Sequence, residues 1–175
     1  MNEQNQADHN PVDGIPTPIP VTVIPGLPGT DGPGSEGLRA SLSEMIETDG
    51  APIVYAESPP VEGKPTALVY GHYDVQPPDP LDQWVSPPFE PTRRDGNLYA
   101  RGATDDKGQV LTHVQSVCQW LATGQPLPLQ VKFLIEGEEE SGGESIEAFV
   151  RQDGGRRLAA DCVVVSDSAM YAPGQ

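Results

Sequence analysis

The ten residues VYGHYDVQPP, 69–78, place a histidine and an aspartate two positions apart at the end of a short apolar run. On an extended segment His72 and Asp74 project to the same side, so the Asp74 carboxylate can orient the His72 imidazole. A carboxylate on one ring nitrogen fixes the tautomer of a histidine that binds metal through the other nitrogen. The alternative is a turn histidine beside a solvated aspartate, and this stretch alone leaves both interpretations open.

The composition limits the class of protein. The chain has 175 residues, 36% of them hydrophobic, with 20 Pro and 19 Gly, so it can bury one modest core. A formal net charge of −16 argues against nucleic acid or an anionic membrane as a partner, because too few basic residues are present to neutralise phosphates. Cys118 and Cys162 form no CxxC pair, which favours buried reduced thiols. With no signal peptide and no apolar run of membrane-spanning length, a cytoplasmic location is expected.

Pro and Gly are concentrated in the first part of the chain. They predict an irregular or disordered segment over 1–45, followed by a globular domain over 46–175. Within the boundary region, apolar residues at helical spacing predict a short helix over 37–47. Short apolar strands are predicted over 51–56, 66–71, 98–100 and 162–165. The clearest strand is LQVKFLI, 129–135, where alternation predicts apolar side chains inward and Gln130 and Lys132 outward.

Two helices are predicted between these strands. The first runs over 106–122, with an apolar stripe on one face, Asp105 or Asp106 as its N-cap, and Gly124 just past its end. His113 lies beside that stripe, where a helix-surface or satisfied core histidine is favoured over a ligand. The second helix runs over 144–151. Strands interleaved with helices indicate an α/β fold.

Polar side chains follow or precede these elements at their ends. His72 and Asp74 follow one strand, Asp105 precedes a helix, and Asp167 follows another strand. Because the carboxyl ends of strands in an open α/β sheet meet at one crevice, these side chains are expected to converge. Carboxylates held a few ångströms apart cannot all stay ionised without a cation. The sequence therefore favours a metal site.

The acidic run Glu138–Glu140 lies between the strand 129–135 and the turn Ser-Gly-Gly. Acidic triplets are usually solvated loops. Here the position after a buried strand, and the flexible turn that follows, allow neighbouring carboxylates to face different targets. One can bind a metal while the next serves as a general base, which is the division that metal-assisted hydrolysis requires.

Four segments, GHYDVQPPDPLDQW, LYARGATDDKGQ, IEGEEESGG and VVSDSAMYAPGQ, together resemble the catalytic domain of the two-metal aminoacylase and dipeptidase metallopeptidase family. This family includes acetylornithine deacetylase, succinyl-diaminopimelate desuccinylase, glutamate carboxypeptidase and carnosine dipeptidase. The resemblance covers about residues 46–175 and is greatest to the dipeptidase branch. It implies a partial three-layer α/β/α zinc-peptidase-like domain with a mixed sheet, without the family's lid and dimerisation domain.

The resemblance also implies a role for each matching residue. His72 would bind the first metal with Asp74 orienting it, Asp105 would bridge two metals, and the Asp105–Asp106 peptide bond would be cis. Glu139 would be the general base. Glu140 would bind the second metal and Asp167 the first.

The implied reaction is hydrolysis of the amide or peptide bond of a dipeptide or N-acyl amino acid, with two divalent ions, Zn, Mn or Co, as cofactors. The family's second metal takes a further histidine from a later part of a longer chain, so these residues are expected to hold one metal and to show little activity. Two other hypotheses stay open: an inactive remnant that binds one metal, and an unrelated acidic domain that binds Ca²⁺ or Mg²⁺. His72 disfavours the last, because hard cations prefer oxygen ligands.

Overall fold

A five-stranded mixed sheet forms the centre of the computed structural model, which describes residues 42–152 and 155–169. The strand order is β1-β2-β6-β3-β7, with β3, β6 and β7 parallel and β1 and β2 antiparallel to their neighbours. The strands are β1 Leu42–Ile46, β2 Ile53–Glu57, β3 Thr66–His72, β6 Gln130–Glu136 and β7 Cys162–Val165. The fold is therefore the α/β class with a mixed sheet that the sequence predicts.

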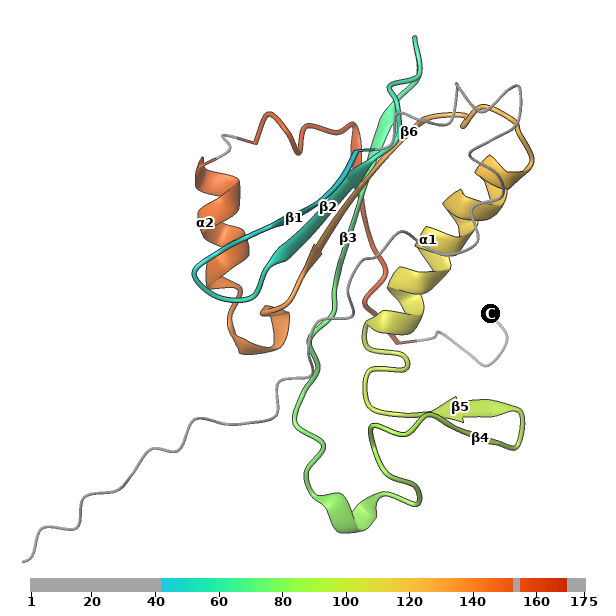
Figure 1. Cartoon of the computed structure of the whole chain (residues 1–175), viewed down its shortest axis with the longest axis vertical. Helices are drawn as coiled ribbons and strands as arrows, with labels where there is room; N and C mark the ends of the chain where they lie inside the picture. Colours follow the sequence, from blue (N-terminus) through green and yellow to red (C-terminus); the bar gives the residue numbers. More distant parts are fainter. Residues whose placement is uncertain (1–41, 153–154, 170–175) are drawn as a thin grey trace, which may run out of the picture.

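The two helices lie on opposite faces of this sheet (Figure 1). Helix α1, Lys107–Ala122, packs Val114 and Val117 against Val69 and Phe133. Helix α2, Glu144–Gln152, covers the other face around Tyr55 and Leu134. This arrangement gives three layers, α/β/α, and each face of the sheet has its own apolar cluster.

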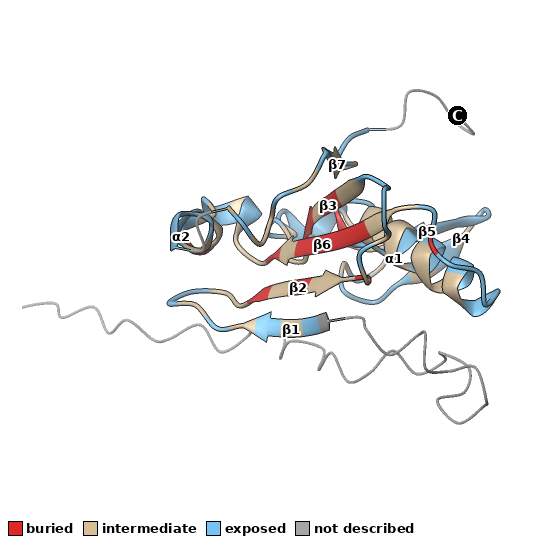
Figure 2. Cartoon of the chain, turned by 90° about the horizontal axis from the view of Figure 1, so that it is seen from above, coloured by how far each residue is buried: buried red, intermediate tan, exposed pale blue. Residues whose placement is uncertain are grey.

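Strand β6 is buried on both faces because it lies in the middle of the sheet, as Figure 2 shows by its colour. Lys132 is only 8% exposed, so its predicted outward orientation into solvent is wrong. The Lys132 ammonium donates hydrogen bonds to the carbonyls of Arg157 and Ala159, at 2.8 and 2.9 Å. A buried ammonium is tolerated here because carbonyl oxygens replace part of its hydration shell.

The expected helix over 37–47 is also wrong where the structure describes it. Residues 42–46 form the edge strand β1, which pairs with β2 in the register Ile46↔Ile53. So short a segment gains little from helical hydrogen bonds alone, whereas the free edge of β2 offers partners along its whole length. The sequence predicts an irregular segment over 1–45. Residues 1–41 of this segment lie outside the described part of the chain, and residues 42–45 belong to β1.

A two-stranded hairpin stands apart from the main sheet, formed by β4, Thr92–Arg94, and β5, Asn97–Tyr99. Its turn is Asp95-Gly96, with φ of 49° and 79°. Two successive positive φ values are typical of the type I′ turn that joins tight hairpins, which explains the Asp-Gly pair. The strand predicted over 98–100 belongs to this hairpin.

Both cysteines are free, but Cys162 is exposed on β7 and therefore not buried as the sequence suggested. Val163 and Val165 beside it are exposed as well, since no described element covers that side of β7. Neither helix in the ranges 42–152 and 155–169 has the length and apolarity needed to cross a bilayer.

Candidate metal centre

His72 is the last residue of β3 and is fully buried. Its Nδ1 lies 3.1 Å from Asp74 Oδ1, and its Nε2 lies 3.0 Å from Asp105 Oδ1. The neutral imidazole that donates from Nδ1 to Asp74 presents the lone pair of Nε2 toward Asp105. The backbone at the end of β3 thus aims a metal-competent nitrogen away from the core.

Asp105 and Asp167 reach the same nitrogen from different elements. Asp105 immediately precedes Asp106, the N-cap residue of α1, and a cis peptide bond joins these two aspartates. Asp167 follows β7, and its Oδ2 lies 3.4 Å from His72 Nε2. Donor atoms of His72, Asp105 and Asp167 all lie within 4.8 Å of one another, close enough to share one ion.

Glu139 and Glu140 form a second group with His72, again with donor atoms within 4.8 Å of one another. They lie in a 3₁₀ turn, Glu139–Ser141, directly after β6. Glu139 Oε2 is 4.0 Å from His72 Nε2. The structure therefore brings the four predicted metal ligands and the predicted general base, Glu139, together at the carboxyl end of the parallel strands, with His72 common to both groups.

Asp74 connects these two groups. Its Oδ1 faces His72, and its Oδ2 accepts a hydrogen bond from the backbone N–H of Glu140 at 2.9 Å. Gln76, four residues after His72, donates to Glu140 Oε2 at 2.5 Å. Gln76 was not singled out from the sequence, although its place in the same motif as His72 and Asp74 is a signal that it lies at this site.

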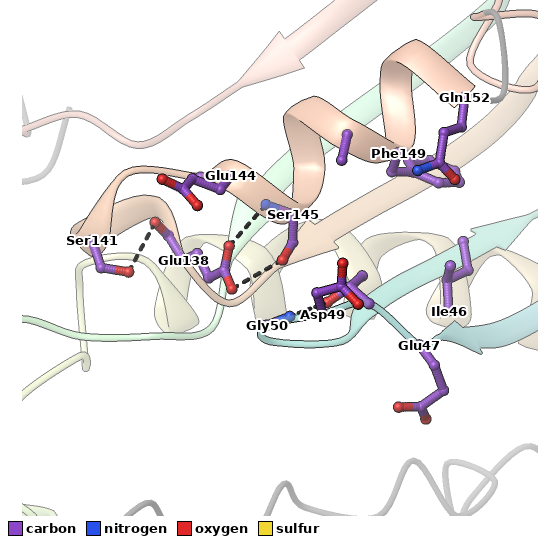
Figure 3. A pocket seen from close by; sticks show the side chains of 13 residues that line it. Ile46, Glu47, Asp49, Gly50, Glu138, Ser141, Glu144, Ser145, Phe149 and Gln152 are labelled. Atoms are coloured by element: carbon purple, nitrogen blue, oxygen red, sulfur yellow. Dashed lines mark hydrogen bonds between the residues drawn. The ribbon is translucent and has the colours of Figure 1, made fainter.

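Glu138 faces the opposite way from its two acidic neighbours. Its carboxylate accepts hydrogen bonds from Ala51 N, at 2.7 Å, and from Ser145 N and Oγ, at 2.9 and 3.0 Å (Figure 3). The Glu138 carbonyl accepts the N–H groups of Ser141, Gly142 and Gly143. Gly142 and Gly143 have positive φ, 125° and 64°, which only glycine adopts readily. Glu138 therefore fixes the turn that carries Glu139 and Glu140.

An open groove beside Glu138 runs between the turn 47–50 and α2, with Ile46, Asp49, Glu144 and Phe149 in its lining. Figure 3 shows Glu138 and Ser145 paired at this groove. None of the carboxylates that face His72 contributes to it. The groove and the metal-facing groups are thus on different sides of the Glu138 turn.

Asp106 occupies the N-cap position of α1, but its side chain does not cap the helix. It is 1% exposed, and its Oδ2 accepts the backbone N–H of His72 at 3.1 Å. Its Oδ1 has no hydrogen-bond partner among the described residues. Burial raises the pKa of Asp106, and the nearby Asp167 carboxylate adds to that rise.

The charges of this cluster alter the proton affinity of its members. Burial lowers the pKa of His72, but the negative charges of Asp74, Asp106 and Glu139 outweigh it, so the pKa is raised overall. Burial, together with Glu140 and Asp167, raises the pKa of Glu139 against the opposing effect of His72. By contrast, hydrogen bonds from Ala51 and Ser145 lower the pKa of Glu138. The carboxylates facing His72 thus repel one another.

The donor set suits a divalent metal. In the part of the chain that the structure describes, His72 is the only basic side chain within ion-pair distance of Asp105, Glu139 and Asp167. One imidazole nitrogen among several carboxylate oxygens is the ligand chemistry of Zn, Mn or Co. A cation there would offset the repulsion from Glu140 and Asp167 that adds to the effect of burial in raising the pKa of Glu139.

Comparison with known proteins identifies the family to which these metal-facing residues belong. The model of peptidase family M20/M25/M40 matches residues 68–175, which contain every side chain of the two groups. The chain is 43% identical over 120 residues to the human Beta-Ala-His dipeptidase, covering 67% of this chain and 23% of that protein. It is 36% identical over 119 residues to a Cys-Gly metallodipeptidase of Schizosaccharomyces pombe, covering 67% of this chain and 25% of that protein.

The fold agrees with a solved structure of the same kind. The crystal structure of human carnosine dipeptidase 1 superposes with a TM-score of 0.70 at 35% identity, covering 76% of this chain and 30% of that chain. The present chain thus spans about a quarter of the length of its curated relatives. A family match over more than half of the chain, with the same fold and with clustered metal-binding side chains, shows that the chain belongs to peptidase family M20/M25/M40.

Proposed function

We propose that this protein is a metal-dependent hydrolase that cleaves the peptide or amide bond of a dipeptide or N-acyl amino acid, and that residues 46–175 supply its metal-binding catalytic domain. The observation that carries the proposal is the geometry of His72, whose Nδ1 faces Asp74 while its Nε2 faces Asp105 and Asp167. The relatives named as dipeptidases support the substrate class.

The two groups of side chains offer positions for two ions, of which these residues alone are expected to hold one. His72 and Asp167 would bind the first ion, Glu140 the second, and Asp105 would bridge them. When bound, such ions polarise a substrate carbonyl and increase the acidity of water. Zn, Mn and Co all suit one imidazole among carboxylates. A cytoplasmic location and the absence of nucleic-acid partners remain predictions from composition.

Glu139 would be the general base. Its raised pKa brings its proton affinity closer to that of the water it must deprotonate near neutral pH. The proton taken onto Glu139 would then pass to the leaving nitrogen of the substrate. Asp74 would keep the proton of His72 on Nδ1 throughout, so that Nε2 remains a ligand.

The test separates metal binding from hydrolysis. Zn²⁺ content and hydrolysis of a β-Ala-His or Cys-Gly dipeptide are measured for the wild-type chain, Glu139→Gln and His72→Ala. We expect Glu139→Gln to keep its metal and lose any hydrolysis, and His72→Ala to lose both. Glu144→Gln, an exposed acid on α2, is the control and should match the wild type.

Metal stoichiometry distinguishes the remaining cases. Near two ions per chain supports a complete pair of sites, whereas one ion without turnover supports a domain that binds metal but does not catalyse. A wild-type chain that binds no Zn²⁺ would refute the proposal.

A further inference from the structure

The segment that carries Asp167 has few contacts of its own. The ladder between β3 and β7 ends at the pair Tyr70↔Val165, and within residues 42–152 and 155–169 no backbone hydrogen bond holds 166–169. The ends of the neighbouring strands are fixed by such bonds: Tyr73 N donates to the Glu136 carbonyl at 2.8 Å. Asp167 therefore needs another constraint to keep its carboxylate 3.4 Å from His72.

Helix α1 supplies that constraint through a side chain. His113 Nε2 lies 2.8 Å from the Oγ of Ser166, the residue directly before Asp167. The hydroxyl can donate or accept, so either neutral tautomer of His113 forms this hydrogen bond. His113 and Ser166 are both half-buried, which shields the bond from competition with water.

Helix α1 is itself fixed against the strand that carries His72. A Cβ added to Gly71 would come within 2.4 Å of Val110 Cγ2 and 2.6 Å of Asp106 Oδ2, so α1 approaches β3 as closely as glycine allows. Asp105 adjoins the start of this helix and His113 lies two turns further along it. Helix α1 is thus connected to both carboxylates that flank His72 Nε2, to Asp105 directly along the chain and to Asp167 through the contact of His113 with Ser166.

A serine beside a histidine also suggests a nucleophile and its base. That arrangement needs a third group to orient the base, and no carboxylate lies within ion-pair distance of His113 among the described residues. Ser166 instead continues directly from the edge strand β7 into Asp167. The geometry favours a supporting contact over a catalytic pair.

We propose that His113 is a positioning residue for Asp167, which acts through Ser166 and sets the affinity of the site formed by His72, Asp105 and Asp167. This inference rests on the metal-binding function proposed above. Neither His113 nor Ser166 touches the ion or the substrate. Loss of their hydrogen bond removes no ligand from the site, but it releases Asp167 from its alignment.

The experiment compares Zn²⁺ affinity, by titration calorimetry, in the wild-type chain and four variants. His113→Phe keeps a ring without its hydrogen bond, Ser166→Ala removes the partner, the double variant removes both, and His113→Gln restores a polar group at the Nε2 position. We expect about tenfold weaker binding in each single variant, no further loss in the double variant, and recovery in His113→Gln. Gln119→Ala, on an exposed site of the same helix, should bind as the wild type does.

A second readout needs no metal. In the metal-free chain, ¹⁵N relaxation of the Asp167 amide should report lower order in His113→Phe than in the wild type, with recovery in His113→Gln. Wild-type affinity in His113→Phe and Ser166→Ala, or additive losses in the double variant, would overturn the inference, as would unchanged relaxation. A wild-type chain that binds no Zn²⁺, but whose Asp167 order depends on His113, would refute the proposed function alone.

Discussion

Asp74 is the residue on which the two groups of ligands depend most. Its two oxygens engage different partners, the His72 ring on one side and the backbone N–H of Glu140 on the other. Both partners are donors, so only an ionised carboxylate, which accepts at both oxygens, satisfies them together. The carboxylate thus sets the tautomer of one ligand and the position of another.

We therefore predict that Asp74→Asn weakens Zn²⁺ binding by roughly tenfold to a hundredfold. Asparagine has one accepting oxygen, so its NH₂ group must face either His72 Nδ1 or Glu140 N–H, and one contact is lost. Calorimetric titration at neutral pH measures the change. Asp79→Asn, in an exposed loop, provides the control, and equal affinity in the two variants would contradict the prediction.

A second prediction concerns pH. The raised pKa of His72 means that a proton stays on the ring to a higher pH than on an ordinary histidine. Because proton and metal compete for Nε2, Zn²⁺ affinity should rise as pH increases through this raised pKa and should be weak below it. Affinity measured from pH 5 to 8 tests this. In Asp74→Asn the midpoint should move to lower pH, since the charge of Asp74 that raises the pKa is removed.

At the scale of elements, the periodicity of apolar residues predicts a helix or strand where the pattern within that one segment is sufficient to determine it. The stripe that includes Val114 and Val117 predicts α1 because these residues do pack against the sheet. The predicted outward orientation of Lys132 and the predicted helix over 37–47 are wrong for a common reason, because each segment depends on a neighbour distant in sequence. For Lys132 these neighbours are the carbonyls of Arg157 and Ala159, and for β1 the neighbour is strand β2. Periodicity within one segment carries no information about such partners.

In the candidate site, too, some features could be predicted from the sequence and others could not. The position of polar residues at the ends of elements predicts that His72, Asp105 and Asp167 converge. His72 and Asp167 do so because β3 and β7 are parallel and adjacent, and Asp105 reaches them from the start of α1. The opposite orientations of Glu138 and Glu139 could not be predicted, since they depend on the backbone N–H groups of Ala51 and Ser145, which donate hydrogen bonds to the Glu138 carboxylate. The contact of His113 with Ser166 likewise joins residues far apart in the chain.

Lys132 gives a prediction at this scale. Lys132→Met keeps the apolar stem but removes the ammonium that bonds the carbonyls of Arg157 and Ala159. We expect the free energy of unfolding to fall by about 2 kcal/mol, because both carbonyls lose a hydrogen bond from a charged donor. Urea denaturation measures this, with exposed Lys64→Met as the control. Equal stability of the two variants would show that the 157–159 segment does not need Lys132.

For the molecule as a whole, the net charge of −16 makes divalent cations favourable partners. We predict that Zn²⁺ at about a hundred times its dissociation constant stabilises the chain by about 2.7 kcal/mol, since the ion binds only the folded state. Thermal unfolding with and without Zn²⁺ measures the effect, and EDTA should reverse it.

Mg²⁺ is the informative comparison in that experiment. An imidazole ligand favours Zn²⁺, whereas Mg²⁺ prefers an all-oxygen site. Stabilisation by Mg²⁺ that equals that of Zn²⁺ and survives His72→Ala would support a generic acidic cation-binding domain and count against the hydrolase.

The position of β6 bears on when the metal centre can assemble. Strands β2 and β3 follow each other in the sequence, yet β6 separates them in the sheet and pairs with both. During synthesis β2 and β3 therefore leave the ribosome with unpaired edges and wait for residues 130–136 to arrive. Strand β7 and Asp167 follow later still. His72 is thus the first ligand to be made, but its site is complete only after Asp167 has been made. Until residues 130–136 are synthesised, the nascent chain carries open strand edges, on which aggregation and chaperones act.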